Sequence, residues 1–247
     1  MKRTVLLILI TCVILSNVYS QNRRVGDYEL NGTVLIKYHG NAREVRIPSN
    51  LGITEIGGFG FMHNRHITSV IIPEGVITIG NNAFAFCINL TSIIIPEGLT
   101  TILQAFNGSG ITNINIPASV TNIAVNNESA NPGGAFTLCE RLININVSSQ
   151  NLVYSSINGI LFNKEGTILL QYPRGRQEQN YTIPNGVTAI GNCAFFEANN
   201  LVNINIPTSI INVGAGAFYN CDNLNSITRN EIIRRFGESV FNFLFAG

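Results

Sequence analysis

The chain repeats one pattern of hydrophobic and polar positions almost from end to end. The three fullest copies share an Ile-Gly start, a central Phe and an Ile-Pro end, and they span residues 56–73, 79–96 and 190–207. Shorter or altered copies span residues 102–117, 133–148 and 213–228. Self-similarity with a period of about 20 to 30 residues predicts a solenoid, in which each repeat packs only on its neighbours.

Each copy ends in a short run that predicts a β-strand. In residues 90–96 (LTSIIIP), Ile93 and Ile95 point to one side and their neighbours to the other, because side chains alternate along a strand. Pro96 ends the strand because it has no N–H for a neighbouring strand. The equivalent strand ends predict eight strands in parallel register, and they are Pro48, Pro73, Pro96, Pro117, Ser148, Pro184, Pro207 and Arg229.

The remaining apolar positions of the repeat predict the core. Phe84 and Leu90 recur at fixed positions, and so does a second apolar pair that includes Leu99 and Ile102. One coil alone cannot bury these groups, whereas stacked coils bury them as ladders spaced by about 4.8 Å. We therefore expect Phe84, Leu90, Ile93 and Ile95 to be fully buried.

Two hairpins interrupt the plain repeats. Residues 32–38 (GTVLIKY) match residues 166–172 (GTILLQY) at a constant offset, and each run leads through a polar loop to an Ile-Pro pair. The Asn31-Gly32 turn predicts the first hairpin, so residues 21–48 are expected to form an N-terminal cap and the first strand. The solenoid is expected over residues 49–229, with a hairpin insertion at about 154–173.

The last segment, residues 230–247, changes period. Its apolar residues fall near one face of a helix, with Asn230 as the expected cap, and they are Ile232, Ile233, Phe236, Val240 and Phe243 or Leu244. We interpret this helix as a cap on the last coil, which a solenoid needs. A helix that binds a membrane or a partner is the alternative.

The amino terminus predicts a secretory signal peptide over residues 1–20. Lys2 and Arg3 precede an apolar run, and small residues follow it, so cleavage is expected after Ser20. The alternative is a lipoprotein acylated at Cys12. In either case we expect a secreted or cell-surface protein with no membrane insertion after the signal is removed.

Composition narrows the function classes. The charged fraction is 12% and the net charge is +1, so the chain lacks the basic excess of a nucleic-acid-binding protein. His63 and His66 have no carboxylate at ligand spacing, and no nucleophile motif or phosphate loop occurs. We therefore expect no metal, no cofactor and no enzymatic activity.

Four cysteines follow the signal segment. Cys87, Cys139 and Cys221 each lie three residues after the repeat Phe, while Cys193 precedes its Phe. One residue type at one repeat position indicates a stacked, buried layer, where a thiol behaves as a small apolar group. We expect free buried thiols, although an even count in an exported chain is also typical of disulfides.

The repeat unit resembles the leucine-rich repeat of BspA-type bacterial surface proteins. The unit reads L-x-x-I-x-I-P-x-x-V-x-x-I-G-x-x-A-F-x-x-C, and the resemblance covers about residues 25–228. It implies a β-rich α/β solenoid with a parallel strand ladder on its concave side, here with two hairpin insertions and a C-terminal capping helix. It also implies secretion or surface display and adhesion to host or partner-cell proteins. Departures are Gly60 before Phe61, a repeat with Phe106 that is two residues short, and Ser148 in place of Pro.

The outward-facing strand positions give the candidate site. Two rows point away from the core, one of Glu44, Ser69, Ser92, Asn113, Asn144, Asn180, Asn203 and Ser226, and one of Arg46, Ile71, Ile94, Asn115, Asn146, Thr182, Asn205 and Thr228. Ile71 and Ile94 are apolar where solvent is expected, which marks a contact site or reflects the strand preference of Ile.

We predict that a protein partner docks on these rows, centred on Ile71 and Ile94. The candidate contact residues are Arg46, Ser69, Ile71, Ser92, Ile94, Asn113, Asn115, Asn144, Asn146, Asn203 and Asn205. A self-assembling envelope protein is the alternative function, and the sequence leaves the partner and the oligomeric state open.

Overall fold

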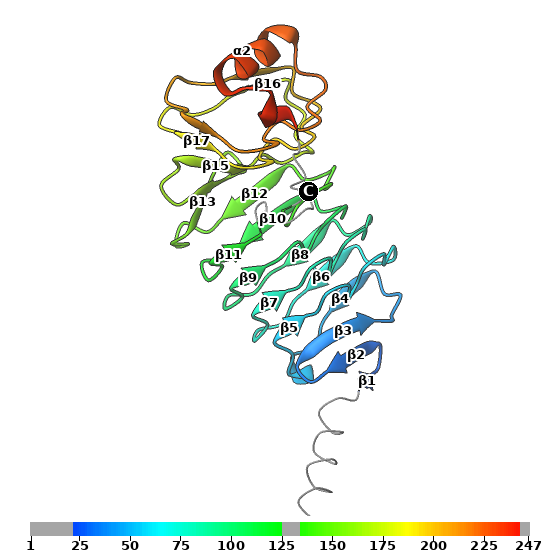
Figure 1. Ribbon diagram of the computed structural model, residues 1–247. Helices are drawn as coiled ribbons and strands as arrows, with labels where there is room; N and C mark the ends of the chain where they lie inside the picture. Colours follow the sequence, from blue (N-terminus) through cyan, green and yellow to red (C-terminus); the bar gives the residue numbers. More distant parts are fainter. Residues whose placement is uncertain (1–21, 125–133, 243–247) are drawn as a thin grey trace, which may run out of the picture.

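The repeated strands form parallel ladders along an elongated stack of coils (Figure 1). The computed structural model of the protein describes residues 22–124 and 134–242. The strands at the Ile-Pro ends of the repeats form three sheets. The first contains β4 (Glu44–Arg46), β6 (Ser69–Ile71) and β8 (Ser92–Ile94). The second contains β10 (Asn113–Ile116) and β12 (Asn144–Val147), and the third contains β16 (Asn180–Thr182) and β18 (Asn203–Asn205). Glu44, Ser69 and Ser92 lie opposite one another. The parallel register predicted for these strands is confirmed within each sheet. Among the described residues there are seven such strands in place of the expected eight, and they form three sheets in place of one ladder.

A second set of short parallel strands includes the second member of the second apolar pair of each repeat, such as Ile102. It comprises β3 (Val34–Tyr38), β5 (Glu55–Ile56), β7 (Thr78–Ile79), β9 (Thr101–Ile102) and β11 (Asn122–Ile123), and, in another sheet, β15 (Ile168–Gln171), β17 (Ala189–Ile190) and β19 (Asn212–Val213). The isoleucines of these strands, such as Ile56 and Ile79, are opposite one another and buried. Each coil therefore contributes one strand to each of two ladders.

Both predicted hairpins are present, and each opens one of these second ladders. The antiparallel strands β1 (Arg23–Val25) and β2 (Tyr28–Asn31) lead into β3, and β13 (Tyr154–Ile157) and β14 (Ile160–Asn163) lead into β15. The sequence match between the two blocks holds in space, because Leu35 pairs with Ile56 as Leu169 pairs with Ile190. The second hairpin thus restarts the solenoid in the same way as the first one starts it.

The turn of the second hairpin also separates β12 from β16. The backbone N–H of Ile145 in β12 donates to the carbonyl of Gly159 in that turn, at 2.8 Å. A side chain at Gly159 would not fit, because its Cβ would lie 2.2 Å from Oδ1 of Asn144. The strand ladder is therefore interrupted between Asn144 and Asn180, where the sequence predicted a continuous ladder.

Stacked aromatic rings form the centre of the core. Phe61, Phe84, Phe106 and Phe136 follow one another with ring centroids 4.9, 5.6 and 5.9 Å apart. Phe84, Leu90 and Ile93 are buried as predicted. The prediction for Ile95 is wrong, since this side chain is only partly buried. β8 does not pair with β10, and Ile95 lines a hollow together with Asn115 of β10 and Asn146 of β12.

The C-terminal helix begins earlier than residue 230. Helix α2 (Ser226–Phe236) is capped by Asn225 and not by Asn230, and the Asn225 side chain accepts the backbone N–H of Thr228 at 2.8 Å. Ser226 and Thr228 therefore lie in the first helical turn and not in an eighth strand. The reason is local, because Asn is a strong N-cap and no proline closes this repeat. The helix ends at Gly237, which has φ +82°, and the short 3-10 helix η2 (Glu238–Phe241) follows. Phe243 and Leu244 lie outside the described residues.

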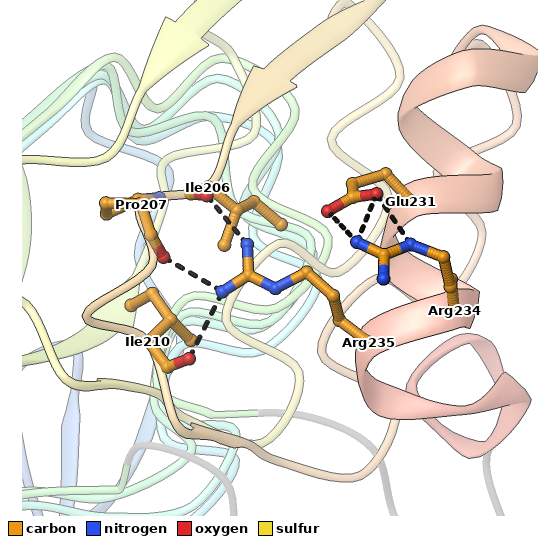
Figure 2. A network of polar contacts seen from close by, with 6 residues as sticks. All are labelled: Ile206, Pro207, Ile210, Glu231, Arg234 and Arg235. Carbon is orange, nitrogen blue, oxygen red and sulfur yellow. Dashed lines mark hydrogen bonds and ion pairs between the residues drawn. The ribbon is translucent and has the colours of Figure 1, made fainter.

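Helix α2 covers the last coil, as the capping interpretation predicted. The Arg235 guanidinium donates to the carbonyls of Ile206, Pro207 and Ile210 at 2.8, 3.0 and 3.3 Å (Figure 2). Ile232 is buried in the core beneath the helix. Within residues 22–124 and 134–242, no helix has the length and apolar character to cross a membrane.

Candidate protein-binding face

The outward side chains of the Ile-Pro strands form a surface that we call the strand face, carried by β4, β6, β8, β10, β12, β16 and β18. The pairing divides this face into three stretches. The first stretch, β4–β6–β8, places Arg46, Ile71 and Ile94 side by side, because these residues pair directly across the sheet. Ile94 is 54% exposed and Ile71 is half-buried.

These three side chains line one hollow of about 700 Å³, which we call the isoleucine hollow. Its walls are the turns that follow the strands, with residues Ile47, Pro48, Ser49, Asn50, Ile72, Pro73, Glu74 and Pro96. Ser49 and Asn50 belong to the short 3-10 helix η1 (Ser49–Leu51). The hollow therefore combines an apolar floor with a cation from Arg46 and an anion from Glu74, and it can take an apolar side chain with polar groups around it.

The sequence identified the floor of this hollow and missed its walls. Ser49, Asn50 and Glu74 follow strand-ending prolines, at positions that vary among the repeats. Pro48 and Pro73 end their strands at the same repeat position, and this alignment could have predicted the walls. Residues that directly follow aligned ends of parallel strands lie close together.

The second stretch, β10–β12, presents amides that bind one another. The Nδ2 of Asn144 donates to Oδ1 of Asn113 at 2.8 Å, and the Nδ2 of Asn146 donates to Oδ1 of Asn115 at 3.0 Å. Each amide keeps further donor or acceptor capacity for solvent or a ligand. Asn115 and Asn146 line a separate hollow of about 360 Å³ together with Ile95.

The third stretch, β16–β18, lies beyond the inserted hairpin turn. The Nδ2 of Asn203 donates to Oδ1 of Asn180 at 2.6 Å, and Asn205 is exposed beside Thr182. The structure therefore brings Arg46, Ile71 and Ile94 together, with Ser69 and Ser92 beside them on the same strands. It does not bring Asn203 or Asn205 to the isoleucine hollow.

The thiols lie in the core and form hydrogen bonds to backbone carbonyls. All four cysteines of the described residues are free and buried, which confirms that prediction. The Sγ of Cys87, Cys139 and Cys221 each donates to the carbonyl of a Phe in a neighbouring coil, at 3.0, 3.0 and 2.9 Å. Burial raises the pKa of each of these thiols to about 12, so they stay protonated at neutral pH. Thiols in this state are poor nucleophiles.

The histidines do not form a metal-binding group. His63 stacks on Phe86 with ring centroids 5.0 Å apart, and His66 lines a different hollow. In the part of the chain that the structure describes, no group of three or more His, Cys, Asp or Glu side chains could hold a metal ion.

Comparison with known proteins identifies the repeats. Residues 37–129 and 175–244 match the family described as BspA type Leucine rich repeat region, in six copies. These two ranges cover more than half of the chain. A comparison with curated proteins gave no match.

Solved structures share the fold. A leucine-rich repeat protein from Eubacterium ventriosum aligns with a TM-score of 0.55 and 24% identity over 80% of this chain. The pneumococcal vaccine antigen PcpA aligns with a TM-score of 0.62 and 19% identity over 83% of this chain. The chain spans less than two thirds of either relative, with 65% of the first and 58% of the second covered.

Proposed function

The chain belongs to the BspA-type leucine-rich repeat family, and from that premise we propose that it binds a protein partner through the isoleucine hollow. Leucine-rich repeat solenoids are typically non-enzymatic scaffolds that mediate protein interactions. The observation that carries the proposal is the pairing of the half-buried Ile71 with the exposed Ile94 within a hollow of about 700 Å³.

The composition of the hollow favours a protein over other ligands. Protein interfaces centre on well-packed apolar or aromatic anchors in pockets, surrounded by polar groups that exclude water. Ile71 and Ile94 supply an apolar floor for such an anchor. Arg46 supplies a charged group of the type enriched at binding hot spots, and Glu74 supplies one of opposite sign.

We place this interaction outside the cell. BspA-type proteins are typically associated with the cell surface, and the chain begins with the features of a signal peptide over residues 1–20. These residues and Cys12 lie outside the described residues. Mass spectrometry of the exported protein tests the proposal, because cleavage after Ser20 leaves Gln21 as the first residue and acylation at Cys12 leaves a lipid-modified one.

The binding experiment compares two pairs of outward-facing isoleucines. Partners are captured with the mature protein from its extracellular surroundings, and the affinity of the identified partner is then measured for Ile71→Asn/Ile94→Asn. Loss of the apolar floor is expected to weaken binding by at least about tenfold, or about 1.4 kcal/mol. The control is Ile211→Asn/Ile227→Asn, which makes the same change at residues that are 72% and 81% exposed elsewhere.

Unchanged affinity in the first variant, with the same circular dichroism spectrum as the wild type, would place the site elsewhere. The next candidates are the hairpin over residues 157–172 and the loop over residues 126–134, most of which lies outside the described residues. Concentration-dependent association of the wild-type protein alone, abolished by the same double substitution, would show that the hollow serves self-assembly.

A further inference from the structure

Three arginines from different coils meet at the opposite ends of the strands that carry the isoleucine hollow. Arg43 precedes β4, Arg65 precedes β6 and Arg141 precedes β12. With His66, Thr68, Asn89 and Thr91 they line a hollow of about 380 Å³, which we call the arginine hollow. All three arginines are exposed.

A glycine in the intervening coil gives Arg141 access to this hollow. Arg141 directly precedes the repeat leucine of its coil. The residue that directly precedes the repeat leucine or isoleucine is Asn89 in the coil of β8 and Gly110 in the coil between these two. Gly110 lies flush against the preceding coil, since a Cβ there would be 2.2 Å from the carbonyl oxygen of Ile88. Gly110 therefore places no side chain between Arg141 and the coil of Asn89.

The floor of the arginine hollow is held by hydrogen bonds between coils. Nδ2 of Asn89 donates to the carbonyl of Arg65 at 2.7 Å, and Oγ1 of Thr91 donates to the carbonyl of Thr68 at 3.2 Å. Oγ1 of Thr68 donates to the carbonyl of Arg43 at 3.1 Å. These bonds use the hydroxyl donors of Thr68 and Thr91 and one of the two N–H donors of Asn89. The floor therefore offers a ligand mainly the acceptor oxygens of its hydroxyl and amide groups.

The arginines of this hollow have no acidic partner among the described residues. None of the ion pairs found there includes Arg43, Arg65 or Arg141. The neighbouring acid, Glu140, pairs instead with Arg174 at 3.6 Å. Three guanidinium groups without a carboxylate form a local positive field that attracts anions.

We propose that the arginine hollow binds a sulfated polysaccharide. The arginines match sulfate as they match phosphate, because a guanidinium donates two parallel hydrogen bonds to the oxygens of such a group. The acceptor oxygens of Thr68, Asn89 and Thr91 suit the hydroxyl groups of a sugar. This combination of cations with acceptors is the one that an anionic, hydroxyl-rich ligand requires.

Two features favour a sulfated glycan over an acidic protein segment or a weakly charged glycan. The lining contains no apolar side chain, whereas protein interfaces centre on apolar anchors. The hollow admits roughly one or two sugar rings, and three arginines border it. A ligand that pairs with all three arginines therefore needs several negative charges within one or two sugar rings. The proposal is independent of the isoleucine hollow, which would remain free for a protein partner.

The test titrates a heparin-derived hexasaccharide into the folded protein and measures heat at low and at physiological salt. The variant Arg65→Gln/Arg141→Gln should bind the hexasaccharide at least about tenfold more weakly than the wild type, because two charge-assisted contacts are lost. The control Arg23→Gln/Arg234→Gln removes the same charge at exposed arginines, one on β1 and one on α2, and should bind like the wild type. Added salt should weaken binding of the wild type.

Each other outcome overturns the proposal. No binding of the hexasaccharide by the wild type, or an equal loss in both double variants, would show that no specific site exists. Equal binding of the desulfated hexasaccharide would show that sulfate is not recognised. Tighter binding of a polyglutamate peptide would assign the hollow to an acidic protein segment. Circular dichroism spectra confirm that each variant is folded, so that a loss of binding is read as a loss of contacts.

Discussion

The first and second stretches of the strand face have the same backbone arrangement and opposite surface chemistry. Ile71 and Ile94 occupy the repeat position that Asn115 and Asn146 occupy two coils further along. The asparagines donate and accept between themselves at 3.0 Å, whereas the isoleucines expose apolar area to solvent. The residue at a single repeat position therefore decides whether the side chains of a stretch hydrogen-bond to one another or present apolar surface that another protein can bury.

The core beneath the two stretches does not explain the difference. Phe84 lies in the coil of β8 and Phe136 in the coil of β12, and both belong to one stack of rings. Ile93 and Ile145 are both buried at equivalent strand positions. The contrast between the stretches is confined to side chains that point outward, so it can be altered without altering the fold.

The largest expected effect is a loss of stability when the core shared by the two stretches is altered. Phe84→Ala removes a ring that packs against Phe61 and Phe106 and should lower the free energy of unfolding by about 3–5 kcal/mol. Urea unfolding measures it, and Ile94→Ala at an exposed position of the adjoining strand is the control. A loss below about 1 kcal/mol would contradict a common, close-packed core.

The next effect compares the thiols beneath the two stretches. Burial raises the pKa of Cys87 and of Cys139 from 9.0 to about 12, so the folded protein keeps protons that the unfolded chain loses. The stabilising contribution is present below pH 9 and is lost as the pH rises toward 12, at a rate of up to about 1.4 kcal/mol per pH unit for each thiol.

Urea unfolding without oxygen between pH 9 and 10 checks this slope. Cys87→Ser and Cys139→Ser should each flatten it to a similar extent. Two partly buried tyrosines add their own slope at higher pH, because desolvation raises the pKa of Tyr28 and Tyr181 from 10.0 to about 12. An unchanged slope in Cys87→Ser would mean that this thiol is exposed to solvent or already ionised.

The smallest effect concerns the amide ladder of the second stretch. A double-mutant cycle with Asn115→Ala and Asn146→Ala should give a coupling energy of about 0.2–1 kcal/mol, since the shared hydrogen bond is exposed to water. The same cycle on Asn113 and Asn205, which do not pair with each other, is the control. A coupling energy equal to that of the control would show that the asparagines do not interact in solution.

Features that recur in every repeat were predicted more accurately than features that occur once. Ile93, Phe84 and the strand-ending prolines recur, so their register and burial follow from the period alone. The helix start at Ser226 depends on one residue, Asn225, and the gap in the ladder between β12 and β16 depends on the turn at Gly159. The first feature is a local capping effect and the second is a contact between coils, and the repeat pattern encodes neither.

The candidate site was predictable to a similar degree. Ile71 and Ile94 stood out because they are apolar in a row of polar residues, and the structure gives them a common hollow. The walls of that hollow depend on turn geometry, and the meeting of Arg141 with Arg43 and Arg65 depends on the missing side chain at Gly110. Neither can be derived from hydrophobic periodicity.

The central claim is that a protein partner contacts the first stretch of the strand face, and site-specific photo-cross-linking tests it most directly. A photoreactive residue replaces Ser92, Asn146 or Asn205 in turn, which leaves both isoleucines intact and samples the three stretches. We predict the highest yield of the cross-linked partner from position 92, a lower yield from position 146 and the lowest from position 205. The highest yield from position 205, or equal yields from all three, would contradict the account.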